Sequence, residues 1–137
     1  MTDIDTKYYA PGADFLLALA QATVANLPDP FRAKAKSVTL LVQDFVDGEH
    51  FADLGLEDPY ELVSLFQNTP DTLWLFRRPI LDEWAERGDV CLADLVAHIL
   101  LPELAAHFGW EDAEIAAHPF LAVALGAAKR RLSEREG

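Results

Sequence analysis

The segment from Val90 to Gly109 constrains the fold more than any other part of this chain. It reads VCLADLVAHILLPELAAHFG, and its apolar residues recur at helical spacing. Asp89, just before it, is a candidate N-cap, and Gly109 is a candidate left-handed C-cap. The sequence therefore predicts a long helix over residues 90–108.

The remainder of the chain alternates between helical and strand patterns. Apolar residues recur at helical spacing over residues 13–27. Strands are expected at residues 37–45, 60–66 and 72–80, with a polar connection at 46–59 and a polar helical turn or loop at 82–89. Pro79 is expected to end the last strand. This order predicts an α+β fold, with a small sheet packed on helices.

Composition narrows the functional class. The chain has 137 residues, of which 51% are hydrophobic, so residues 1–137 are expected to form one domain with its own core. Lys and Arg number 11 against 23 Asp and Glu, a net charge of -12. Nucleic acid and anionic membrane surfaces attract basic proteins, so both are excluded as partners. No apolar run reaches the length of about 18 residues that a membrane helix needs.

The single cysteine bears on the compartment. Cys91 has no second cysteine to pair with, so the chain holds no internal disulfide. A reducing compartment suits such a chain, and we expect a bacterial, cytoplasmic protein in which Cys91 is a buried structural thiol.

Within the long helix, residues 98–112 read HILLPELAAHFGWED and have the outline of a zinc-peptidase motif. Such a site needs two histidines four residues apart, a glutamate beside the first of them, and a third ligand beyond the helix. Glu103 can be the glutamate. Pro102 and Ala106, however, stand where the two histidines are needed.

Residues 37–115 resemble the small bacterial zincin-like family of predicted zinc metallopeptidases, whose motif runs H-E-x-G-H-H-F-G-x-x-D. The resemblance extends to DPYELVSLFQNTPDTLWLFRRPILDEWAERGD at residues 58–89 and to LADLVAHIL at 92–100. Ser64 and Asn68 depart from the family pattern, because glycine is usual at both positions.

The resemblance implies a fold and a set of site residues. The fold is the zincin-like minimal metallopeptidase fold: a small mixed sheet packed against an N-terminal helix and the motif-bearing helix. An extra C-terminal helix at residues 118–137 lies outside the pattern. Glu103 takes the position of the general base and Asp112 that of the third ligand. Pro102 and Ala106 replace the two zinc histidines.

Two aromatic side chains are expected at the former cleft. His107 matches an additional histidine of the motif that is not a metal ligand, and Trp110 follows the helix end. Glu103 and His107 are four residues apart, so they would form a favourable surface pair if His107 is charged.

These residues predict a domain that has lost catalysis. Without zinc nothing lowers the pKa of a water molecule toward neutrality, so Glu103 is at most a vestigial base. Pro102 adds a cost of roughly 3 kcal/mol or a local kink, because it lacks an amide donor inside a helix. We expect no cofactor, and a binding or regulatory module for an extended peptide or protein.

Two alternatives are open. The first is a metal-dependent peptidase whose rearranged zinc site uses His98, Glu103 and Asp112. His98 lies on the stripe of Pro102 and Ala106 one turn upstream, although a histidine satisfied by a neighbour is the simpler interpretation. The second is an acidic interaction protein with no function in the cleft.

Overall fold

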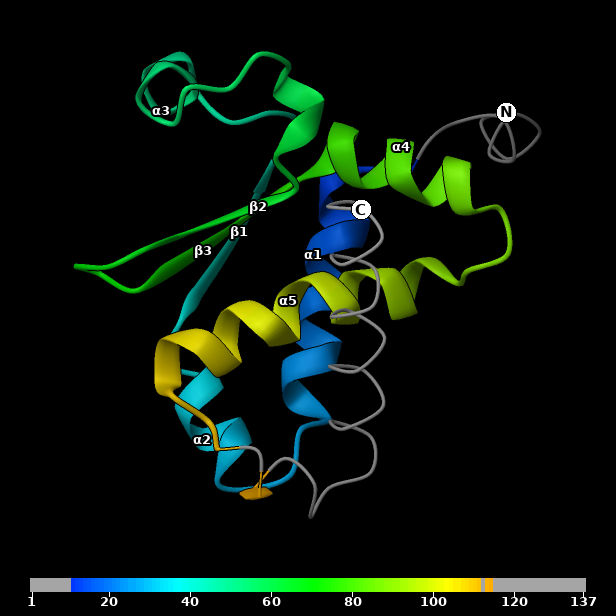
Figure 1. Cartoon of the computed structure of the whole chain (residues 1–137). Coiled ribbons are helices and arrows are strands. Elements are labelled where there is room, and N and C mark those ends of the chain that lie inside the picture. The colour runs from blue at the N-terminus through cyan, green and yellow to red at the C-terminus, as the bar shows by residue number, and fades with distance from the viewer. Residues whose placement is uncertain (1–10, 112, 115–137) are drawn as a thin grey trace.

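The computed structural model describes residues 11–111, 113 and 114, and it has an α+β fold (Figure 1). Its elements in chain order are α1 (Ala13–Ala25), α2 (Phe31–Ala35), β1 (Thr39–Gln43), α3 (Gly48–Asp53), the 3₁₀ helix η2 (Pro59–Glu61), β2 (Ser64–Gln67), β3 (Thr72–Phe76), α4 (Arg77–Arg87) and α5 (Leu92–Phe108). The predicted fold class is confirmed. The C-terminal helix expected at 118–137 lies outside the described residues.

The sheet is small and mixed, as predicted. Its strand order within the described residues is β1-β3-β2. β1 runs parallel to β3, whereas β2 runs antiparallel to β3 across a short turn. β3 is therefore the central strand, and β2 lies at one edge of the sheet.

The core lies between one face of this sheet and the helices α1 and α5 (Figure 1). Leu73 and Leu75 point from β3 into it and are fully buried. Helices α1 and α5 pack on this face and against each other. Their fully buried side chains are Leu16, Ala20, Val96, Leu100, Leu101 and Leu104. This packing holds α5 across the sheet, with its C-terminal half beside β2.

Helix α5 is the predicted long helix, with one difference at its start. It runs unbroken through Pro102, and Gly109 ends it in the left-handed conformation, with φ 63° and ψ 41°. The N-cap is Cys91 rather than Asp89, and no side chain caps the helix there. Cys91 is exposed, so the expectation of a buried thiol is wrong. An N-cap residue belongs to the loop that enters the helix, which keeps this thiol out of the core.

The third strand is shorter than predicted. β3 ends at Phe76, and α4 begins at Arg77 and continues to Arg87, where Gly88 ends it with φ 74°. Pro79 is therefore the third residue of a helix and does not end a strand. Proline fits there because the amides of the first helical turn have no partner within the helix.

The connection between β1 and β2 also contains structure that the sequence pattern did not predict. Asp47 caps α3 by accepting a hydrogen bond from the His50 amide. Asp58 and Glu61 form a reciprocal capping box around η2, which shortens the second predicted strand to Ser64–Gln67. Charged side chains that read as a polar loop thus serve as helix caps.

Replacing Pro102 tests how much the proline destabilises helix α5. Pro102→Ala restores an amide donor for the carbonyl of His98 and removes the ring clash, so we expect the free energy of unfolding to rise by about 1–3 kcal/mol. Urea unfolding followed by circular dichroism measures it. Pro79→Ala is the control, because a first-turn amide gains no partner within its helix, and no rise is expected. Equal stability of Pro102→Ala and the parent would contradict the prediction.

Candidate functional site

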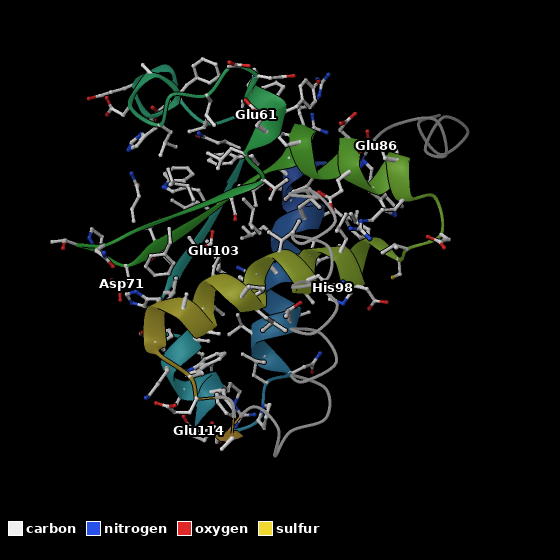
Figure 2. The ribbon with its side chains drawn as sticks, in the orientation of Figure 1. Glu61, Asp71, Glu86, His98, Glu103 and Glu114 are labelled. Atoms are coloured by element: carbon white, nitrogen blue, oxygen red, sulfur yellow. The ribbon has the colours of Figure 1, made fainter. Side chains whose placement is uncertain are left out.

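The site lies between the C-terminal half of α5 and the edge strand β2 (Figure 2). Glu103 is half-buried on the side of α5 that faces the sheet, and its Oε2 accepts a hydrogen bond of 2.7 Å from the Ser64 hydroxyl. Ser64 is the first residue of β2. This bond joins the predicted general base to the strand edge, at a position where the family pattern usually has glycine.

One turn further along α5, His107 makes a second link to the hairpin. Its Nε2 lies 2.9 Å from the Asp71 Oδ2, just before β3 begins. The imidazole also stacks on Phe66 of β2, with ring centroids 4.1 Å apart and an interplanar angle of 26°. Glu103 and His107 therefore each have a hydrogen-bond partner outside the helix, Ser64 for Glu103 and Asp71 for His107.

The free edge of β2 presents main-chain groups beside these side chains. Phe76 donates its amide to the Val63 carbonyl at 2.9 Å, and Ser64 pairs in register with Leu75. Bonded and non-bonded pairs alternate in an antiparallel ladder, so Ser64 and Phe66 direct their N–H and C=O groups away from β3. No strand among the described residues pairs with that side of β2.

Trp110 lies in the core instead of lining the cleft. It is 8% exposed, and its ring meets Phe31 edge-on with centroids 4.8 Å apart. The turn at Gly109 directs the chain back toward α2, which explains this burial. Of the two aromatic residues expected at the cleft, only His107 lies beside Glu103.

Of the remaining predicted site residues, those that the structure describes do not converge on Glu103. Pro102 is half-buried and Ala106 exposed on α5, while Asp112 lies outside the described residues. His98 and Glu103 are five residues apart on one helix, which places them about 140° apart around its axis and about 7.5 Å apart along it. His98 thus leaves α5 in a different direction from Glu103.

The described side chains around Glu103 do not fit a zinc ion. A protein zinc site takes imidazole or thiolate ligands that converge on one point. Within residues 11–111, 113 and 114, no three His, Cys, Asp or Glu side chains form a group that could hold a metal ion. The nearest polar partner of Glu103 is a serine hydroxyl, which is a poor ligand for zinc.

Comparison with known protein families provides independent evidence on the identity of this fold. A family model described as zincin-like metallopeptidase matches residues 35–119, more than half of the chain. The chain belongs to the zincin-like metallopeptidase family. The match contains the whole of the resemblance at 37–115. A search of curated proteins found no match.

On the opposite face of the zincin-like sheet lies a polar chain that the sequence did not reveal. The Trp74 indole donates to the Gln67 Oε1 at 2.8 Å, and the Gln67 Nε2 lies 2.7 Å from the His50 Nε2. The other ring nitrogen of His50 lies 2.8 Å from the Asp47 Oδ2. This chain of hydrogen bonds links α3 to β2. In the sequence, only the spacing of Asp47 and His50, which is typical of a capped turn, indicated part of this hydrogen-bond chain.

This chain of hydrogen bonds depends on the protonation state of His50. An indole can only donate, so the Gln67 oxygen must face Trp74 and its amide nitrogen must face His50. The His50 Nε2 then accepts, and its Nδ1 donates to Asp47. If Nε2 of His50 carried a proton, it and the Gln67 Nε2 would both be donors and could not bond to each other. If the Gln67 amide turned so that its oxygen accepted that proton, the hydrogen bond from Trp74 would be lost.

Two opposing influences therefore act on the pKa of His50. Its hydrogen bond to Asp47 raises the pKa of His50 above the ordinary value, and the His50 amide bond lowers the pKa of Asp47. Stability from the charged pair is lost as the pH rises through the raised pKa of His50. It is also lost as the pH falls through the lowered pKa of Asp47. The Gln67 amide opposes protonation.

We predict that the Trp74 indole signal titrates with His50. Gln67→Met removes the opposing amide and should raise the pKa of His50 further, whereas Asp47→Asn should lower it. Two-dimensional NMR of the imidazole and indole resonances measures both effects. The indole of Trp84, which donates to the Val90 carbonyl, is the internal control. A Trp74 signal that ignores the titration of His50 would refute the coupling.

Proposed function

We propose that this chain is a non-catalytic zincin-like domain that binds an extended peptide or protein segment along β2. The observation that carries the proposal is the free edge of that strand, where Ser64 and Phe66 direct main-chain groups outward beside Glu103 and His107. An extended segment can add to such an edge by main-chain hydrogen bonds, while side-chain contacts give specificity.

The donor set supports the loss of catalysis. Hydrolysis in this family needs a zinc-bound water, and Pro102 and Ala106 offer no nitrogen or oxygen side chain to a metal. The Ser64 hydroxyl already occupies one oxygen of Glu103. Glu103 then acts as a fixed acceptor at the edge of the sheet.

The proposal extends to the cell compartment. No helix in the part of the chain that the structure describes is both long enough and apolar enough to cross a membrane. The net charge of -12 and the single cysteine support a cytoplasmic domain with a peptide or protein as its partner.

Metal content tests the catalytic half of the proposal. We expect untagged, purified protein to hold no stoichiometric zinc, and Pro102→His/Ala106→His to gain it, because the pair restores two imidazoles four residues apart. Elemental analysis by mass spectrometry measures both, with Ala106→His as the single-ligand control. Stoichiometric zinc in the parent, abolished by His98→Ala, would overturn the proposal. A double variant without zinc would show that Pro102 and Ala106 are not the ligand positions.

Hydrogen exchange and a matched pair of variants test the binding half. The Ser64 and Phe66 amides should exchange rapidly in the free protein and become protected when an extended peptide binds. Ser64→Pro deletes an outward amide without removing a bond to β3, so it should abolish this binding. Ser64→Ala loses the hydroxyl but keeps the amide, and it should still bind. Binding that persists in Ser64→Pro would rule out the edge of β2 as the docking site.

A further inference from the structure

We propose that the segment docked on β2 runs antiparallel to it and carries a lysine or arginine opposite Ser64 and an apolar or aromatic residue opposite Phe66. This inference rests on the proposed function and adds the direction, the register and the side chains of the partner. In the partner sequence it corresponds to an aromatic or apolar residue, then any residue, then Lys or Arg.

The charge follows from Glu103. Its Oε2 accepts from Ser64, whereas its Oε1 has no hydrogen-bond partner among the described residues. No lysine or arginine in that part of the chain forms an ion pair with it. The described arginine ion pairs are Arg32–Asp29, Arg77–Asp44 and Arg87–Glu83. A strand laid over β2 would cover this half-buried carboxylate further, and a cation on that strand compensates the lost hydration.

The register follows from the ladder. Ser64 and Phe66 direct their main-chain groups outward. Antiparallel pairing is slightly more stable per residue than parallel pairing, so the added strand runs antiparallel and pairs with these two residues. Directly opposed residues place their side chains on the same face, about 5.5 Å apart between Cα atoms. The side chains of Ser64 and Phe66 both face α5. The partner residue opposite Ser64 therefore extends toward Glu103, within reach of a lysine or arginine.

The second position follows from the ring surface. The residue opposite Phe66 meets Phe66 and the imidazole stacked on it, and the bond to Asp71 holds that imidazole in place. An apolar or aromatic side chain suits this flat surface. An antiparallel partner passes Phe66 before it passes Ser64, so its apolar residue precedes its basic residue by two positions.

Charge also distinguishes the partner from a second copy of this chain. Each copy has a net charge of -12 and would bring its own Glu103 to the shared edge. Like charges near one another oppose that pairing, whereas a basic segment is attracted. The occupant is therefore a segment of a different, basic protein.

Four fluorescein-labelled nonapeptides test the inference by anisotropy, with Phe-Thr-Lys, Phe-Thr-Gln, Phe-Thr-Glu or Lys-Thr-Phe at the centre of an otherwise constant sequence. We expect Phe-Thr-Lys to bind about tenfold more tightly than Phe-Thr-Gln at low salt, and 0.5 M NaCl to reduce the difference. Glu103→Gln keeps an acceptor for Ser64 and should abolish the preference. Glu86→Gln, an exposed position on α4, is the matched control and should keep it. Glu103→Lys should favour Phe-Thr-Glu.

The outcomes separate the two proposals. Equal affinity for Phe-Thr-Lys and Phe-Thr-Gln, with Ser64 and Phe66 protected from exchange, would overturn the basic partner and leave edge binding intact. Tighter binding of Lys-Thr-Phe would overturn the antiparallel register. If none of the four peptides bound or protected these amides, both proposals would fail. A preference for lysine that survives in Glu103→Gln would exclude Glu103 as its cause.

Discussion

The burial of α5 between α1 and the inner face of the sheet is the interaction on which the rest of the structure depends. Leu100, Leu101 and Leu104 are fully buried there. Each such side chain contributes about 1.5–3 kcal/mol, so together they exceed the cost of roughly 3 kcal/mol for a proline inside a helix. Tertiary packing thus explains how α5 passes through Pro102 unbroken, although Pro102 lacks the amide that a helical position requires.

The same packing places a carboxylate where it needs a partner. With α5 held across the sheet, Glu103 lies half-buried beside β2, and the Ser64 hydroxyl satisfies one of its oxygens. His107 is satisfied in the same way by Asp71. On the other face, Gln67 links β2 to the capped turn of α3. Side-chain bonds therefore hold β2 from both faces, which would reduce the entropy lost if a further strand paired with it, as proposed.

The sequence predicted those parts of the structure that local patterns determine. The apolar repeat before Gly109 gave the long helix, and the β-branched run gave β1. The family resemblance at residues 37–115 lies within the matched range of 35–119. Glu103 could be singled out from the sequence because its place in a motif is itself a local property.

Contacts between distant residues were not predictable in this way. Cys91 was expected in the core and Trp110 at the cleft. Instead, Cys91 is exposed in the loop that enters α5, and Trp110 is buried after the turn that ends α5. The partner of His107 lies 36 positions away, and a pairing on the same helix was the only one visible in sequence. Pro79 was ambiguous because proline both ends strands and fits the first turn of a helix.

Catalysis and binding make different demands on the residues around Glu103. A hydrolase needs an electrophile that polarises the peptide carbonyl and a water whose pKa has been lowered. The residues described around Glu103 supply a carboxylate, a hydroxyl and an imidazole tied to an aspartate, and none of these is an electrophile of that strength. An edge that binds an extended segment needs outward main-chain groups, a flat ring surface and a fixed charge, and all three lie within four residues of β2 and one turn of α5. Because those features need no metal, the proposed replacement of two imidazoles by Pro102 and Ala106 would remove the chemistry of the family and leave the proposed means of recognition intact.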